Sequence, residues 1–162
     1  MNRKILALGL TLLVMAGVAS TSASAGGGDP FSGAWTLNVQ KSDFGTGTAP
    51  ASAKVVISAS KKSDKLVNDT TYADGRKVHY EYSGPIDGSD VAVTGAPLFD
   101  SVSTLRADKY TRIRTERQGG KVVGIATATV SHDGKTLTAV RRGISTHGPQ
   151  PSYTSVFDRA KH

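Results

Sequence analysis

The chain has 162 residues, of which 38% are hydrophobic, and its formal net charge is +7. The length suits a single domain, and the apolar fraction excludes an intrinsically disordered chain. The sequence contains no cysteine, which excludes disulfide frameworks, cysteine-based zinc sites, cysteine-linked lipid anchors and thiol catalysis.

The first 25 residues have the three-part pattern of a secretory signal peptide. A basic head at Arg3 and Lys4 precedes an apolar run over 5–18, and small residues follow up to Ala25 in an A-x-A pattern. The apolar run is shorter than the roughly 20 residues that a membrane-spanning helix needs. We therefore predict cleavage after Ala25, a flexible leader over 26–30, and a periplasmic or extracellular mature protein that is not membrane-integral.

The remaining residues, 31–162, are predicted to form one domain of short strands. Runs rich in Val, Ile, Thr and Tyr alternate with polar residues, and no long stretch keeps the spacing of an amphipathic helix. Four dipeptides suited to tight hairpins separate some of these runs, namely Asp74-Gly75, Asp87-Gly88, Gly119-Gly120 and Asp133-Gly134. The strands are expected at 34–39, 53–60, 65–72, 76–82, 90–94, 100–106, 109–117, 121–131, 135–142 and 152–159.

This succession of strands favours an all-β, antiparallel up-and-down barrel. An open sheet of about ten strands would curl or split and would expose two edges, whereas closure removes the edges. A two-sheet β-sandwich is the alternative, but its Greek-key connections need longer loops than most of those available here. The longest connections are 40–52 and 143–151.

The strand predicted at 109–117 carries charge on one face and Ile113 on the other. Burying an unpaired charge costs several kcal/mol, whereas exposing one isoleucine costs about 2 kcal/mol. We therefore predict that Ile113 points inward and that the basic residues form a solvated outer face. Those basic residues are Arg106, Lys109, Arg112, Arg114, Arg117 and Lys121.

The same alternation in other strands predicts an interior that mixes hydroxyl groups with apolar side chains. Such a lumen suits water or a ligand, although its hydroxyls could equally bond to one another and to buried water. His79 falls on the outward face of its strand. The candidate ligand-binding residues are Tyr72, Tyr80, Tyr82, Ile113, Tyr153 and Phe157.

The two ends of the predicted domain resemble the calycin superfamily, which includes lipocalins and fatty-acid-binding proteins. Gly33-Ala34-Trp35 opens the first strand, and Val156-Phe157-Asp158-Arg159-Ala160 looks like the last. The chain also resembles secreted bacterial members of this superfamily to which no activity is assigned. The resemblance implies a barrel that holds small hydrophobic molecules, with Gly33, Trp35 and Arg159 closing one end in a structural role.

Two departures from the fatty-acid-binding pattern argue against a fatty-acid ligand. The Arg-x-Tyr that grips the carboxylate in that family is matched here by Ser155-Val156-Phe157, and a buried carboxylate without donors would be costly. The position of that family's two-helix lid is occupied by 41–50, which is too rich in glycine and threonine for two helices.

No other chemistry is indicated by the sequence. The four histidines lack metal-ligand spacing, no catalytic motif occurs, and no cofactor is predicted. Export argues against nucleic acid as a partner, while the positive charge would suit weak contact with anionic envelope glycans or lipids. We therefore expect a barrel that binds a small, largely apolar molecule without catalysis. The alternative is an envelope protein-interaction module, an inhibitor or assembly factor, that makes contact through the 40–52 loop around Phe44.

Overall fold

The computed structural model describes residues 28–45, 47–144 and 151–161. The predicted signal peptide and residues 26–27 of the leader therefore lie outside the described residues. One short 3-10 helix, η1, spans Val39–Lys41. The ten strands are β1 Gly33–Leu37, β2 Pro50–Ala59, β3 Ser63–Tyr72, β4 Lys77–Pro85, β5 Asp87–Ala92, β6 Ser101–Arg106, β7 Thr111–Gln118, β8 Lys121–Val130, β9 Thr136–Gly143 and β10 Tyr153–Arg159.

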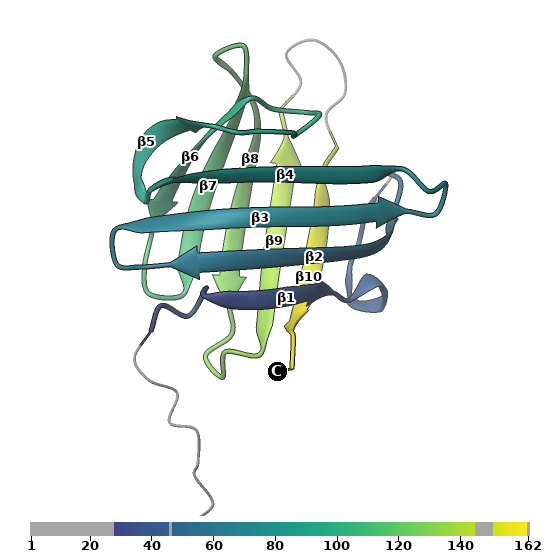
Figure 1. The fold of residues 1–162 in the computed structure, drawn as a ribbon, viewed down its shortest axis with the longest axis horizontal. Helices are drawn as coiled ribbons and strands as arrows, with labels where there is room; N and C mark the ends of the chain where they lie inside the picture. Colours follow the sequence, from purple (N-terminus) through teal and green to yellow (C-terminus); the bar gives the residue numbers. More distant parts are fainter. Residues whose placement is uncertain (1–27, 46, 145–150, 162) are drawn as a thin grey trace, which may run out of the picture.

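The strands form one antiparallel sheet that curls into a nearly closed barrel (Figure 1). The order is β4-β3-β2-β1-β10-β9-β8-β7-β6-β5, so β1 joins the two halves by pairing with β10. β4 approaches the segment that follows β5 at an isolated bridge between Glu81 and Thr94. The predicted up-and-down barrel is therefore confirmed. No helix in the part of the chain that the structure describes has the length and apolar character to cross a membrane.

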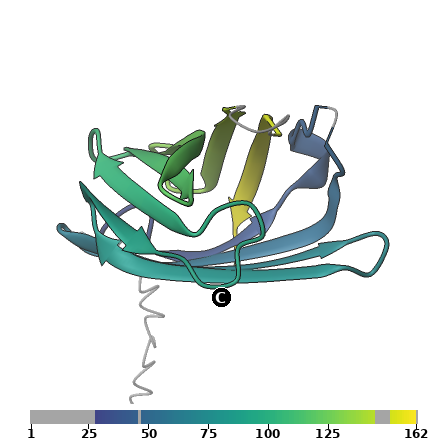
Figure 2. The same cartoon turned by 90° about the horizontal axis from the view of Figure 1, so that it is seen from above.

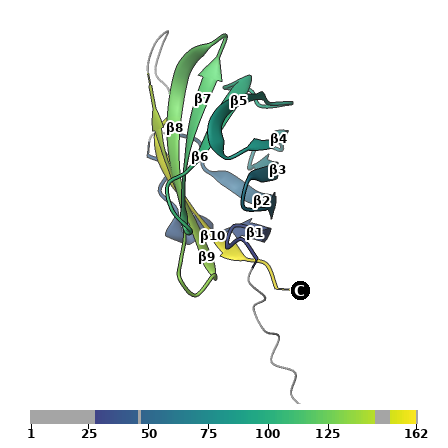
Figure 3. The same ribbon diagram turned by 90° about the vertical axis from the view of Figure 1, so that its left-hand side faces the viewer.

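The barrel is flattened into two layers, which Figures 2 and 3 show from above and from one side. Strands β1 to β4 cross the other layer, which contains β6 to β10, at a steep angle (Figure 1). Side chains that point inward from both layers meet in the space between them. The apolar part of this core is built around Trp35, Val55, Leu66, Val102 and Phe157.

Three of the four predicted turn dipeptides join paired strands, and one does not. Asp87-Gly88 opens β5 at a register shift between Asp87 and Asp90. The chain bends one residue earlier, at the buried Ile86. The prediction of a tight hairpin at this point was wrong because β4 and β5 diverge here and β5 takes β6 as its partner.

Trp35 and Arg159 lie together at one end of the barrel. Trp35 is fully buried and donates from Nε1 to the carbonyl oxygen of Phe31 at 2.9 Å. The Arg159 guanidinium carbon lies 4.1 Å from the centroid of the Trp35 ring, and this guanidinium also donates to the carbonyl oxygen of Ser32 at 2.6 Å. Gly33 fits beneath it because a Cβ atom there would collide with Arg159 Nη1.

The predicted orientation of β7 was wrong. Arg112 and Glu116 are buried and Arg114 points toward the interior, whereas Ile113 lies on the opposite face and is only partly covered. The prediction treated the charges as unpaired, but each of these three residues forms an ion pair inside the barrel. Paired charges do not carry the full penalty of an isolated buried charge.

The neighbouring strand β8, which pairs with β7, supplies the space for these long side chains. Arg112, Arg114 and Glu116 stand opposite Ala128, Ala126 and Gly124, and directly opposed residues in an antiparallel pair project to the same face. The small inward residues of β8 thus accommodate the large inward residues of β7.

Candidate functional site

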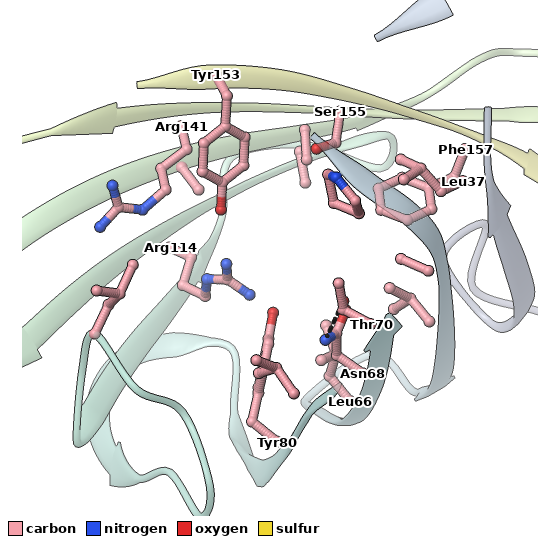
Figure 4. A pocket seen from close by; sticks show the side chains of 18 of the residues that line it. Leu37, Leu66, Asn68, Thr70, Tyr80, Arg114, Arg141, Tyr153, Ser155 and Phe157 are labelled. Atoms are coloured by element: carbon pink, nitrogen blue, oxygen red, sulfur yellow. Dashed lines mark hydrogen bonds between the residues drawn. The ribbon is translucent and has the colours of Figure 1, made fainter. Parts of the chain in front are cut away.

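A cavity of about 450 Å³ lies between the two layers of the barrel. One side of it is apolar and is formed by strands β1, β2, β3, β9 and β10. Figure 4 shows Phe157 and Leu37 together on that side, with Leu66 further round the wall. The apolar lining consists chiefly of Leu37, Ala53, Val55, Ile57, Leu66, Leu137 and Phe157.

The other side of the cavity is polar and centres on Arg114. Figure 4 shows this side chain projecting from β7 into the space between Tyr80 and Tyr153, whose hydroxyl groups point toward the middle of the cavity. Arg141 comes from β9 on the same face. The register explains this placement, because Arg114 and Arg141 both stand opposite Ala126 of β8.

A single buried carboxylate lies between the two arginines. Glu116 Oε1 accepts from Arg114 Nη2 at 2.7 Å, and its Oε2 accepts from Arg141 Nε at 2.7 Å. Glu116 is fully buried. Gly124 makes room for this arrangement, since a Cβ atom there would lie 2.6 Å from Arg141 Nη2 and 2.8 Å from Glu116 Oε2.

A separate ion-pair cluster lies at the end of the cavity near Phe31. Arg112 donates to Asp64 at 2.6 Å and to Asp29 at 2.9 Å, and Arg106 also pairs with Asp29. The Arg112 guanidinium carbon lies 4.2 Å from the centroid of the Phe31 ring. This cluster ties the leader residue Asp29 to strands β3, β6 and β7.

The environment keeps the arginine charged and the tyrosines neutral. Burial alone would lower the pKa of Arg114, but nearby Tyr80, Glu116 and Tyr82 hold that pKa well above its ordinary value. Burial raises the pKa of Tyr82 and of Tyr153. Burial also raises the pKa of Asp64, against the opposing effect of Arg112. The polar side of the cavity therefore presents a guanidinium cation and neutral hydroxyl groups at neutral pH.

The rim of the cavity includes part of the long 40–52 loop. Asp43 forms a β-bridge with Thr154, and this bridge holds Phe44 against Tyr153 with 6.5 Å between ring centroids. Arg76 lies over the Tyr72 ring, with 3.9 Å from its guanidinium carbon to the ring centroid. Phe44, Tyr72, Arg76 and Leu98 all belong to the lining.

Five of the six predicted ligand-binding residues line the cavity, namely Tyr72, Tyr80, Tyr82, Tyr153 and Phe157. Ile113 is not among the lining residues because its side chain points to the opposite face of β7. Sequence reasoning missed Arg112, Arg114 and Arg141, which do line the cavity. The signal that could have found them is the run of small residues at every second position of β8, at 124, 126 and 128.

The structure places two of the histidines on the surface, and His147 and His162 lie outside the described residues. His79 Nδ1 lies 2.7 Å from Asp69 Oδ1 on the outer face, and His132 packs against Tyr110 with 4.7 Å between ring centroids. Within the described ranges, no group of three or more histidine, aspartate or glutamate residues is arranged to hold a metal ion.

Comparison with known proteins gives distant similarity only. A solved structure described as EF1p2_mFAP2b bound to DFHBI is 13% identical with a TM-score of 0.49, and covers 81% of this chain and 94% of its own. A redesigned beta barrel, mFAP1, bound to DFHBI is 12% identical with a TM-score of 0.43, and covers 80% of this chain and 95% of its own. No protein-family model and no curated protein matches the chain.

Proposed function

We propose that this protein is an exported, calycin-like barrel that binds a small, largely apolar molecule in its central cavity without catalysing a reaction. The observation that carries the proposal is the cavity itself, with a volume of about 450 Å³. Cavities of roughly 300–1,000 Å³ with a mostly apolar wall and a few oriented polar groups are typical of small-molecule sites.

The inward hydroxyl groups favour a ligand-filled lumen over a packed one. Asn68 and Thr70 do bond to each other, at 3.0 Å. Tyr80 and Tyr153, however, point their hydroxyl groups toward the middle of the cavity from opposite sides (Figure 4). A space of this size exceeds by far what one bridging water molecule needs, which supports a larger occupant.

The lining also supports binding without catalysis. Its charged groups at neutral pH are arginines and the ion-paired Asp64, and the pKa values of two lining tyrosines are raised away from neutrality. A general base or an activated nucleophile would need a pKa near the working pH. The polar side of the cavity is therefore suited to donating hydrogen bonds.

Export is supported by the basic, apolar and small-residue pattern of 1–25. Mass determination of the protein recovered from the periplasm or medium of its host should give a chain that begins at Gly26. Recovery of the full-length chain from the cytoplasm alone would contradict this part of the proposal.

Filling the cavity tests the binding proposal directly. Ala139 of β9 lines the cavity, so Ala139→Trp should abolish the fluorescence enhancement of the neutral dye N-phenylnaphthylamine. Val140→Trp is the matched control because Val140 is the next residue and is 38% exposed. Ser155→Phe on β10 repeats the test from another strand, and circular dichroism checks that each variant is folded. Undiminished dye binding in both cavity variants would overturn the proposal.

The alternative, a protein-interaction module that acts through the 40–52 loop, is less well supported. Phe44 is half-buried and packs on Tyr153 instead of standing out as a contact residue. Phe44→Ser should therefore alter dye binding more than it alters the recovery of any partner protein from envelope extracts. The opposite result would favour the interaction module.

A further inference from the structure

We infer that the ligand carries one anionic group and that this group binds at Arg114. The inference rests on the proposed function, because it assumes that the cavity holds a small molecule. It adds the chemical class of that molecule, which is a compact acid with an otherwise apolar body.

The charges around the cavity do not balance. In the cluster near Phe31, two arginines, Arg106 and Arg112, face two carboxylates, Asp29 and Asp64. In the second cluster, two arginines share the single carboxylate of Glu116. The second cluster therefore carries one uncompensated positive charge within the barrel.

Of the two arginines in that second cluster, Arg114 is the one that remains able to bind. Arg141 uses Nε on Glu116, Nη1 on the carbonyl oxygen of Pro151, and Nη2 on the carbonyl oxygen of Val123 at 3.4 Å. Arg114 donates to Glu116 through Nη2, and its buried Nε has no hydrogen-bond partner among the described residues. Its side chain is 18% exposed, and Figure 4 shows it projecting into the cavity.

The surroundings of Arg114 strengthen its attraction for an anion. The rings of Phe99 and Tyr82 lie with their centroids 5.7 Å and 6.0 Å from the guanidinium carbon. These rings exclude water, and a charge pair is stronger in such a low-dielectric setting than in water. The hydroxyl groups of Tyr80 and Tyr153 point to the same region (Figure 4) and can donate to the same anion.

The remainder of the cavity defines the rest of the ligand. The wall opposite Arg114 is mostly apolar, with Leu37, Leu66 and Phe157 beside a few polar groups (Figure 4), so a mostly apolar ligand body fits it. A neutral ligand would leave the cation uncompensated, and a cationic ligand would be repelled. Because Arg114 and Arg141 together exceed Glu116 by one positive charge, a single carboxylate, sulfonate or similar group matches the site better than a polyanion.

The missing donor pair in the last strand was one of the two departures that argued against a fatty-acid ligand. Residues 155–157 of β10 provide no arginine, and β7 was expected to direct its arginines outward. With β7 reversed, the donor comes from the middle of the barrel wall. The anion site is thus built on β7, with hydroxyl groups from β4 and β10.

Two dyes with the same ring system test the inference. Anilinonaphthalene sulfonate carries one negative charge, and N-phenylnaphthylamine is the same molecule without the sulfonate. Because a hydrogen bond to a charged group contributes about 1.5–3 kcal/mol, the wild-type protein should bind the sulfonate about tenfold more tightly or better. Arg114→Met should remove this preference by weakening the binding of the sulfonate much more than that of the neutral dye, while Arg114→Lys should restore part of the preference.

Two further variants test whether the charge balance inside the cavity sets the affinity for the sulfonate dye. Glu116→Gln removes the internal carboxylate and should tighten sulfonate binding, since two cations then lack a partner. Arg142→Met removes a positive charge from the exposed face of β9 and should change the affinity for neither dye.

Each outcome separates this inference from the proposed function. Equal affinity of the wild type for both dyes overturns the anion site but leaves the ligand-binding barrel in place. An equal loss of affinity for both dyes in Arg114→Met also overturns the anion site, because the arginine would then affect binding only by maintaining the structure of the cavity. Binding of neither dye by the wild type overturns both proposals.

Discussion

Arg112 and Arg114 are two residues apart on β7 and both point into the barrel, yet their surroundings differ. Arg112 lies between two carboxylates, Asp64 at 2.6 Å and Asp29 at 2.9 Å. Arg114 shares one carboxylate, Glu116, with a second arginine. Burial of an arginine therefore does not by itself mark a binding site in this molecule. The local balance of charge distinguishes an arginine that holds the fold together from one that is left able to bind.

The largest effect on stability is expected from removing the balanced arginine. Arg112→Met leaves Asp64 without its arginine partner and Asp29 with Arg106 alone, and both carboxylates have side chains 4% exposed. Breaking a buried ion pair on one side costs about 3–5 kcal/mol. Urea unfolding should show a loss of that order. A loss below about 1 kcal/mol, the level typical of exposed ion pairs, would show that the cluster near Phe31 does not stabilise the barrel.

A somewhat smaller loss is expected from crowding the unbalanced cluster. Gly124→Ala places a methyl group within 2.8 Å of Glu116 Oε2 and within 2.6 Å of Arg141 Nη2. Overpacking of a buried site costs about 1–3 kcal/mol, so thermal unfolding should shift to a lower temperature. The displaced carboxylate should also change the affinity for the sulfonate dye. Unchanged stability together with unchanged dye affinity would mean that Glu116 is not held where the structure places it.

Arg159, at the end closed by Trp35, pairs with no carboxylate among the described residues. Arg159→Met removes hydrogen bonds to the carbonyl oxygens of Ser32 and Pro30 and the contact with the Trp35 ring. We expect a loss of about 1–2 kcal/mol. Because Trp35 is the sole tryptophan, its emission spectrum reports on this end alone and should shift to longer wavelength. An unshifted spectrum would contradict the packing described here.

The smallest effect is expected on the surface, at Asp158. Hydrogen bonds from Asn38 and Lys41 lower the pKa of this exposed carboxyl below its ordinary value of 3.8. A carboxyl whose pKa is lower in the folded state stabilises the fold above the unfolded-state pKa and loses that effect as the pH falls through the folded-state pKa. Asp158→Asn should therefore melt slightly lower than the wild type near neutral pH, and the difference should vanish at pH values well below 3.8. A difference that persists in acid would rule out the carboxylate as its cause.

The fold was largely predictable because it depends on local patterns. Alternation and turn dipeptides located all ten strands, with boundaries that mostly differ from the observed ones by a few residues. Asp87-Gly88 was the exception, since a dipeptide pattern cannot show whether the strands on either side will pair. The inward positions of Tyr80 and Tyr153 also followed from simple alternation.

The polar half of the cavity was not predictable in the same way. The inward position of Arg114 could be predicted only by knowing which charged groups surround it. Arg141, which pairs with the same Glu116, lies 27 positions from Arg114 along the chain. Likewise, Asp64 pairs with Arg112 across a separation of 48 residues. Alternation gives the two faces of a strand but not which one is inside when charges can pair across the interior. The small residues at alternate positions of β8 were the available clue.

The difference between the two arginines is tested most directly by the free energy of unfolding of Arg114→Met, measured by urea titration beside Arg112→Met. Glu116 keeps Arg141 as a partner at 2.7 Å, and the substitution removes an uncompensated buried charge. Arg114→Met should therefore remain within about 1 kcal/mol of the wild type, while Arg112→Met loses about 3–5 kcal/mol. Equal losses in the two variants would contradict the account, because both arginines would then serve the fold and neither would be left to bind a ligand.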